Sequence, residues 1–208
     1  MIILILIFLV FQPPAVYSQS AKEFLQRGTV LFEKGDLKRA IDRFSRSIEM
    51  DSALSEAYIK RGDSKRMLED YKGAVEDYNK ALLQKKDDFR GYFKRAIAEC
   101  LMKNYQDALK DYNTAVKLKP NNAEAIFGRG CTKYLMKDFE GAISDFSEAL
   151  ELNSANELIA FSRGAAKEET GDITGAVSDY KLAASLNPRF KVTDYFIKRA
   201  EGRLKPEK

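Results

Sequence analysis

The sequence predicts an all-α solenoid of five repeats, each 34 residues long, followed by a C-terminal capping helix. Three features recur at this period without an insertion. The first is an arginine followed by glycine, or once by alanine, at Arg27, Arg61, Arg95, Arg129 and Arg163. The others are an alanine twelve residues after that glycine or alanine and an aromatic residue four residues further on, at Ala40 and Phe44, Ala74 and Tyr78, Ala108 and Tyr112, Ala142 and Phe146, and Ala176 and Tyr180. Such a fixed period indicates one structural unit stacked five times.

The N-terminus contains a separate signal. An unbroken apolar run extends from Ile2 to Phe11 and ends before a Gln-Pro-Pro segment. Val16 and Ser18 then provide the side chains of a processing site, so the sequence predicts a signal peptide over residues 1–18. The run is too short to cross roughly 30 Å of hydrocarbon as a helix. We expect an exported protein, periplasmic or secreted, with no membrane insertion after processing. The alternative is an uncleaved N-terminal anchor, because no lysine or arginine precedes the apolar run.

Each predicted repeat consists of two amphipathic helices joined by a short turn. The repeats span residues 21–54, 55–88, 89–122, 123–156 and 157–190. The sixteenth residue of each repeat is expected to cap the second helix with its side chain, and these residues are Asp36, Asp70, Asn104, Asp138 and Asp172. Gly35 and Gly171 precede this position, where a helix often ends in a left-handed residue. Pro120 and Pro188 end the second helix of the third and fifth repeats.

The last segment, residues 191–208, is predicted to be a capping helix with a basic tail. Its apolar residues fall on one helical face that would cover the end of the last repeat, and they are Val192, Tyr195, Phe196 and Ala200. Residues 189–208 contain seven basic and three acidic side chains, which accounts for the whole net charge of +4. We expect a solvated cap; the alternative is a contact with an anionic surface or an acidic partner. No nucleic-acid partner is expected, because a basic stripe would then follow the body of the domain.

The repeat resembles that of the tetratricopeptide repeat family from Ala21 to about Phe190. The shared features are an apolar or aromatic fourth residue, a small eighth residue, alanine at position 20, an aromatic residue at position 24 and a small residue at position 27, the last being Ser47, Ala81, Ala115, Ala149 and Ala183. The resemblance implies a right-handed superhelical solenoid with a protein or peptide as its partner. It also implies that the first helices line a concave groove in which partner segments usually lie.

One departure from the family pattern is regular. The family usually has leucine at position 7, where this chain has the five arginines named above. Tyrosine is frequent in the family at position 23, where repeats two to five have Asp77, Asp111, Asp145 and Asp179. Because a lone buried guanidinium is costly, we expect each arginine to pair with the aspartate of its own repeat. Repeat one has Arg43 at position 23 and should lack the pair. A ladder of arginines that binds an anionic ligand is the alternative.

The resemblance places positions 2, 5, 9, 12 and 13 of each repeat along the groove. The candidate partner-binding residues at these positions are Leu25, Ile59, Phe93, Ile97, Leu101, Phe127, Tyr134, Leu135 and Phe161. Those of the third and fourth repeats form the most apolar stretch, and a contiguous exposed patch of this kind usually marks an interaction site. Packing of one first helix against the next explains the same residues equally well. The lysine and asparagine pattern with which some family members hold a C-terminal carboxylate is absent.

The sequence predicts neither catalysis nor a cofactor or metal. The chain has no histidine, the usual acid–base group near neutral pH and the commonest metal ligand. Cys100 and Cys131 are expected to be small buried hydrophobic residues rather than a disulfide. Adjacent carboxylates such as Glu168 and Glu169 are expected on solvated faces. We therefore predict a non-catalytic scaffold that binds another protein in its groove. The alternative is a structural or assembly factor that acts through its convex face or by end-to-end stacking.

Overall fold

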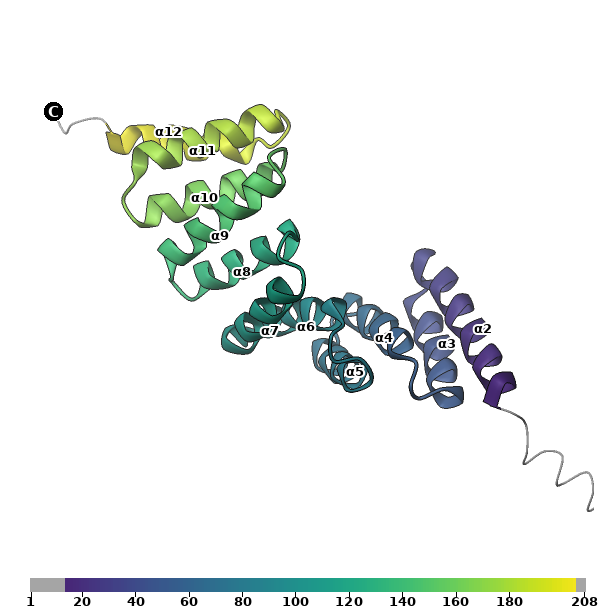
Figure 1. Cartoon of the computed structure of the whole chain (residues 1–208). Coiled ribbons are helices and arrows are strands. Elements are labelled where there is room, and N and C mark those ends of the chain that lie inside the picture. The colour runs from purple at the N-terminus through teal and green to yellow at the C-terminus, as the bar shows by residue number, and fades with distance from the viewer. Residues whose placement is uncertain (1–13, 205–208) are drawn as a thin grey trace, which may run out of the picture. The chain divides into compact units, whose positions relative to one another are not determined.

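The computed structural model describes the backbone of residues 14–204 and the side chains of residues 20–204. Every regular element in this part of the chain is an α-helix (Figure 1). The bounds are α2 Pro14–Glu33, α3 Leu37–Met50, α4 Ser55–Met67, α5 Tyr71–Gln84, α6 Phe89–Leu101, α7 Tyr105–Leu118, α8 Ala123–Leu135, α9 Phe139–Leu152, α10 Glu157–Glu169, α11 Ile173–Leu186 and α12 Val192–Leu204. The predicted all-α fold is therefore confirmed for the described residues.

The described residues form two compact units that divide between Met102 and Lys103. Of the described helices, unit 1 contains α2 to α6 and unit 2 contains α7 to α12. Within each unit, every helix packs against the next helix along the chain, as Figure 1 shows. Four first helices begin at the same point of the 34-residue period, at Ser55, Phe89, Ala123 and Glu157. The predicted packing of consecutive helices in pairs is confirmed.

The predicted signal peptide falls mostly on residues 1–13, which lie outside the described residues. The predicted cleavage point after Ser18 lies within α2, which begins at Pro14. Between residues 14 and 204, no helix has the length and apolar character needed to cross a bilayer.

Side chains cap the second helix at four of the five predicted positions. Asp36, Asp70, Asp138 and Asp172 each accept a hydrogen bond from the backbone N–H three residues later, at 2.9–3.3 Å. Each bond satisfies a donor that the start of a helix would otherwise leave without a partner. At the fifth position, Asn104 is the N-cap residue of α7, but its side chain makes no capping hydrogen bond. The residue before the cap is left-handed in all five turns, with φ of 78° at Gly35, 65° at Glu69, 64° at Lys103, 66° at Lys137 and 87° at Gly171. Three of these turns adopt this conformation without glycine.

The recurring small and aromatic residues meet inside the helix pairs of the first, second, fourth and fifth repeats. The alanine at position 20 is fully buried in every repeat, at Ala40, Ala74, Ala108, Ala142 and Ala176. In the fifth repeat, a Cβ atom at Gly164 would lie 2.9 Å from the ring of Tyr180, which is itself fully buried. The absence of a side chain at this glycine allows α10 to approach α11 closely, because protein interiors are close-packed.

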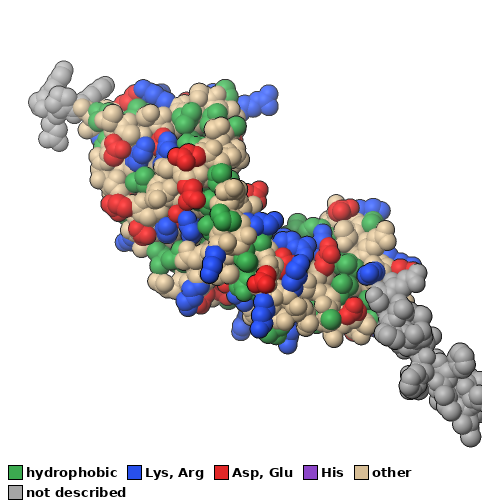
Figure 2. Space-filling view, viewed as in Figure 1, with side chains coloured by type: hydrophobic (Ala, Val, Ile, Leu, Met, Phe, Trp, Pro, Cys, Tyr) green, Lys and Arg blue, Asp and Glu red, His purple; other side chains and the backbone are tan. Residues whose placement is uncertain are grey.

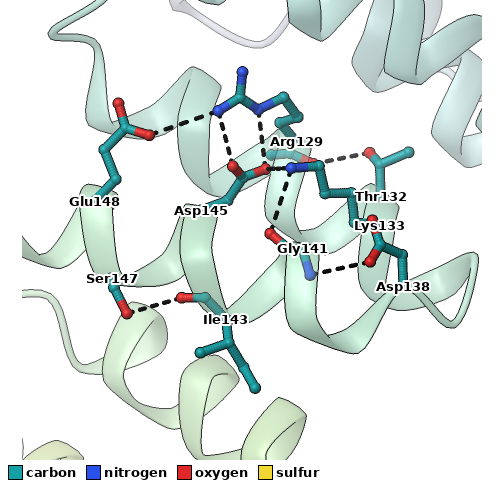
Figure 3. A network of polar contacts seen from close by, with 10 residues as sticks. Arg129, Thr132, Lys133, Asp138, Gly141, Ile143, Asp145, Ser147 and Glu148 are labelled. Carbon is teal, nitrogen blue, oxygen red and sulfur yellow. Dashed lines mark hydrogen bonds and ion pairs between the residues drawn. The ribbon is translucent and has the colours of Figure 1, made fainter.

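The predicted arginine–aspartate pairs form in the second, fourth and fifth repeats. They join Arg61 to Asp77, Arg129 to Asp145, and Arg163 to Asp179. Figure 3 shows the fourth repeat, where Arg129 donates from Nε and Nη2 to the two carboxylate oxygens of Asp145, at 2.9 and 2.8 Å. The three aspartate side chains are at most 4% exposed, so each carboxylate is neutralised inside the packing by a bidentate, charge-assisted contact.

In each of these three repeats, a lysine lies one helical turn after the arginine. We call the three clusters of arginine, lysine and aspartate the ion-pair ladder. The amines of Lys65, Lys133 and Lys167 lie 2.8–2.9 Å from the carboxylates of the same aspartates. These lysines were not predicted from the sequence, although all three occupy position 11 of their repeats. The arginine also reaches the preceding repeat, because Nη1 of Arg61 donates to Oγ of Ser45 at 3.0 Å. The ladder therefore joins the two helices of a repeat and links them to the repeat before.

The predicted capping helix is α12, which packs against α11. Ala200 is fully buried in this contact. The ring centroid of Phe196 lies 5.5 Å from that of Tyr180 and 5.0 Å from that of Phe161. Phe196 and Ala200 thus cover the end of the last repeat as predicted. Val192 and Tyr195 were expected on the same covering face, but they are 40% and 63% exposed.

Candidate functional site

The predicted partner-binding residues lie on first helices in both units. Unit 1 contains Leu25 on α2, Ile59 on α4, and Phe93, Ile97 and Leu101 on α6; unit 2 contains Phe127, Tyr134 and Leu135 on α8 and Phe161 on α10. Their exposure differs. Ile59 is 2% exposed and packs in the core with Tyr58 and Ala81, Leu101 and Leu135 are about half exposed, and the other six are half-buried. Burial therefore argues against a binding role for Ile59 alone.

Three of the predicted residues meet at one apolar pocket in unit 2. Tyr134, Leu135 and Phe161 line it together with Cys131, Phe146, Ser162, Ala165 and Phe196. The side chains come from α8, α9, α10 and α12, so the pocket depends on the stacking of two repeats and the cap. An open apolar pocket formed by several elements is the usual form of a ligand or peptide site.

Aromatic contacts hold the walls of this pocket in place. Phe161 packs edge-on against Phe196 and Phe190, with ring centroids 5.0 and 5.4 Å apart. The ring of Tyr134 packs edge-on against that of Phe139 at 5.3 Å. Such edge-to-face pairs restrict the rings more than burial alone would. The walls are therefore set before a partner arrives, which lowers the entropic cost of binding.

Leu135 and Tyr134 form the accessible edge of the pocket. The Leu135 side chain is half exposed although it is large and apolar. Burial, followed by the nearby carboxylates of Glu169 and Glu168, raises the pKa of the Tyr134 phenol above its ordinary value. Like an unperturbed tyrosine, the phenol is neutral at physiological pH, and its hydroxyl can donate a hydrogen bond to a partner.

Phe127 has a packing role. Its ring is half-buried and lies 5.6 Å from that of Phe146, within the main core cluster of unit 2. Cys131, on the same helix, is also half-buried and lines the pocket. For Phe127, the packing explanation left open by the sequence thus has direct structural support.

The cap is fixed to the last repeat by a buried carboxylate that sequence analysis misplaced. Glu168 was expected on a solvated face, but it is 8% exposed. Its carboxylate accepts hydrogen bonds from the hydroxyl of Tyr180 at 2.9 Å, from Arg199 at 2.5 Å and from Arg203 at 2.9 Å. The correction has a physical reason: both arginines belong to α12, about thirty residues further along, so no local pattern shows that they cover Glu168.

Hydrogen bonding determines the charge of this carboxylate. Burial acts to raise the pKa of Glu168, but the hydrogen bonds from Arg199, Tyr180 and Arg203 outweigh it and lower the pKa below its ordinary value. Glu168 is therefore ionised at neutral pH and attracts both guanidiniums of α12. Because Phe196 lies on the same helix, this contact also holds one wall of the pocket.

The charged surface around the site is mixed in sign. Figure 2 shows basic and acidic side chains interspersed over the visible face of each unit, with apolar side chains between them. Among residues 20–204, no group of three or more cysteine and carboxylate side chains could hold a metal ion. The apolar pocket is the feature of unit 2 that best fits a binding role.

Comparison with family models identifies the repeat. Two tetratricopeptide repeat models match residues 25–90 and 123–156, and a TPR repeat model matches residues 98–137. The chain contains tetratricopeptide repeats. No curated protein matches the chain.

Solved structures show the same TPR fold at low sequence identity. YrrB, described as a TPR protein with an unusual peptide-binding site, is 19% identical with a TM-score of 0.74 over 89% of this chain and 100% of YrrB. MamA from Desulfovibrio magneticus RS-1 is 18% identical with a TM-score of 0.77 over 82% of this chain and 97% of that one. A tetratricopeptide repeat protein from Parabacteroides merdae ATCC 43184 is 20% identical with a TM-score of 0.77 over 88% of this chain and 72% of that one. These likenesses establish the fold of this TPR protein.

Proposed function

We propose that this TPR protein is a non-catalytic scaffold that binds a segment of another protein through the apolar pocket of unit 2. The observation behind the proposal is the convergence of Tyr134, Leu135 and Phe161 at one open pocket. TPR proteins commonly act as scaffolds for protein interactions, and YrrB is described as having a peptide-binding site. A large apolar residue exposed at a preformed aromatic pocket is typical of an anchor position.

The pocket favours a large apolar side chain of the partner. Its walls are aromatic and aliphatic, and the thiol of Cys131 and the hydroxyl of Ser162 add weakly polar edges. An aromatic or long aliphatic side chain would gain most from burial there, at roughly 25 cal/mol per Å² of apolar surface removed from water. The Tyr134 hydroxyl could then bond to the backbone of the bound segment.

The test compares two matched variants of the full chain. Leu135→Asp introduces a charge at the edge of the pocket, and Leu152→Asp introduces the same charge at a similarly exposed leucine on α9, outside the pocket. Peptides are selected from a random library against the wild-type chain, and their Kd values are measured by calorimetry. We expect Leu135→Asp to weaken binding by about 2 kcal/mol or more, as at a hot spot. Leu152→Asp should bind as the wild type does.

Equal loss in the two variants, or equal retention, would contradict this use of the pocket. Circular dichroism melting curves of both variants must match the wild type, since both leucines are partly solvated already. Peptides that bind both variants equally would place the binding surface elsewhere on the TPR protein.

A role in assembly is the second candidate. The outer face of α12 exposes Tyr195 and Val192, which are 63% and 40% accessible. End-to-end contacts between copies would bury this face. Sedimentation equilibrium of the wild type and of Tyr195→Ser tests the idea. A mass that rises with concentration in the wild type alone would support assembly, and a constant mass in both would exclude this face as the contact.

A further inference from the structure

The ion-pair ladder is interrupted in repeat one, residues 21–54. The arginines of this repeat have no aspartate at position 23 with which to pair. In the second, fourth and fifth repeats, the aspartate at position 23 lies between an arginine at position 7 and a lysine at position 11. Repeat one has Arg27 at position 7, Leu31 at position 11 and Arg43 at position 23. An arginine thus replaces the carboxylate that the other repeats enclose.

The two guanidiniums of repeat one lie against the same ring. The Cζ atoms of Arg27 and Arg43 are 5.9 and 6.0 Å from the centroid of Phe24. A cation–π contact stabilises each of them. Because both charges lie near one ring, the local potential is positive and favours an anion nearby.

The carboxylates near these arginines are peripheral. Arg27 lies 3.9 Å from Glu23, and Arg43 lies 3.7 Å from Asp42, its neighbour in the chain. Both acidic side chains are more than half exposed. Exposed pairs at such distances contribute little to stability. By contrast, the Asp77 side chain of the next repeat is only 3% exposed and forms ion pairs with Arg61 and Lys65.

A third arginine lines the same pocket. Arg27, Arg39 and Arg43 surround it together with Gln26, Val30 and Leu31. Arg39 occupies position 19, where the second, fourth and fifth repeats have glycine. The Val30 side chain is 43% exposed and supplies an apolar edge. Arg39 also pairs with Asp36 at 3.3 Å, and its side chain is 70% exposed. The pocket therefore presents three arginines, each beside a carboxylate at the surface, next to an aliphatic edge.

The position of this pocket within the repeat keeps it open. In later repeats, the arginine at position 7 also contacts the second helix of the repeat before it, as Arg61 contacts Ser45 and Arg163 contacts Ser147. The side chains of Arg27 and Arg39 are 66% and 70% exposed, so a ligand can reach them.

We propose that Arg27, Arg39 and Arg43 form a binding site for carboxylate side chains of an acidic protein segment. The chain itself provides the precedent, because three of its repeats bind an aspartate at the equivalent place through the arginine at position 7. The guanidinium fork matches a carboxylate in bidentate geometry. Val30 and Leu31 would contact the methylene groups of glutamate or of neighbouring apolar residues. This site in unit 1 does not depend on the pocket of unit 2.

The experiment measures binding of a fluorescein-labelled hexaglutamate peptide to the full chain by fluorescence polarisation, with hexaglutamine as the uncharged control. The decisive variant is Arg43→Asp, which restores the aspartate of the other repeats. The matched control is Arg46→Asp on the same helix, which makes the same change in charge at an exposed arginine outside the pocket. We expect Arg43→Asp to weaken hexaglutamate binding at least about tenfold and Arg46→Asp to weaken it by less than about threefold.

Melting temperatures give an independent result. Arg43→Asp should raise the melting temperature, because Arg27 gains an internal partner, whereas Arg46→Asp should not. If Arg43→Asp fails to fold by circular dichroism, the double variant Arg27→Gln/Arg43→Gln replaces it, and the same loss of binding is expected. Equal losses in the Arg43 and Arg46 variants would overturn the proposal, since net charge alone would then explain them. Binding to anionic phospholipid vesicles without binding to hexaglutamate would also overturn it.

Discussion

Arg163 donates from Nε and Nη2 to the two carboxylate oxygens of Asp179, at 2.8 and 2.6 Å, and the Asp179 side chain is 4% exposed. Lys167 lies 2.8 Å from the same carboxylate. Two cations thus share one buried anion, and the pKa of Arg163 is raised by its hydrogen bond to Asp179. Because the same cluster recurs in three repeats, its energetics bear on the stability of the whole fold.

Removing one cation from this cluster should lower the free energy of unfolding less than removing both. Arg163→Leu loses two charge-assisted hydrogen bonds, but Lys167 still neutralises Asp179, so we expect the free energy of unfolding to fall by about 1–2 kcal/mol. Arg163→Leu/Lys167→Leu leaves the buried carboxylate without either cation and should cost about 3–5 kcal/mol. Urea denaturation of both single variants, the double variant and the surface control Lys198→Leu measures this. A double variant equal to the sum of the singles would show that the cations do not compensate for each other.

The close approach of α10 and α11 gives a second prediction. Gly164→Ala would place a Cβ atom 2.9 Å from the Tyr180 ring and 3.1 Å from the carbonyl oxygen of Ala176. We expect a loss of about 1–3 kcal/mol from this overpacking, which outweighs the helix propensity gained by alanine. The control is Gly202→Ala in α12, where a Cβ atom meets nothing within 4 Å.

Gly202→Ala should change the stability in the opposite direction and increase it. Alanine there restricts the unfolded chain and favours the helix, so a gain of up to about 1 kcal/mol is expected. Thermal and urea denaturation of both variants measure the two effects. Similar shifts of the same sign would mean that helix propensity, and not the contact with Tyr180, determines the outcome at Gly164.

The sequence was sufficient to predict the features that depend on spacing along a helix. The caps at Asp36 and Asp70 lie next to the helices they cap, and Arg129 and Asp145 lie on the two helices of one repeat. The fold follows from these regularities because each repeat contacts mainly its neighbours. The same reasoning could have predicted the lysines of the ladder, because Lys133 lies four residues after Arg129 on one helical face.

Features that depend on distant segments could not be predicted in this way. Glu168 is buried because two arginines of α12 cover it, and neither is close to it in the sequence. The pocket of unit 2 needs Phe196 of the cap as well as side chains of two repeats. Ile59 illustrates the opposite error: a position assigned to the groove by the family pattern can be filled by core packing, and the sequence has no marker that separates the two.

Export is a separate prediction, because the predicted signal peptide lies mostly outside the described residues. We propose that the protein is exported and that cleavage after Ser18 leaves a mature N-terminus near Gln19. The removed segment would include the apolar run Ile2–Phe11 and the first residues of α2. Intact mass and N-terminal sequencing of the native protein measure this. A native chain that still begins at Met1 and sediments with membranes would support the uncleaved anchor instead.

The contact between Glu168 and the cap should make the docking of α12 dependent on pH. The pKa of Glu168 in the folded chain is below its ordinary value of 4.5. A lowered carboxylate pKa stabilises the folded state above the unfolded pKa, and this contribution is lost as the pH falls through the folded value. Docking of α12 should therefore be constant near neutral pH and weaken below about pH 4.5.

Hydrogen exchange of the α12 amides between neutral pH and pH 3, corrected for intrinsic rates, measures this docking. Glu168→Gln should lower the protection of α12 at neutral pH by about tenfold or more, because the charge that attracts Arg199 and Arg203 is removed. Its protection should then change little as the pH falls. The control is Glu169→Gln, the same substitution at the adjacent exposed residue, which should keep the wild-type pH dependence. If Glu169→Gln flattens the profile as Glu168→Gln does, or if neither does, the acid-sensitive contact of the cap is not the one between Glu168 and α12.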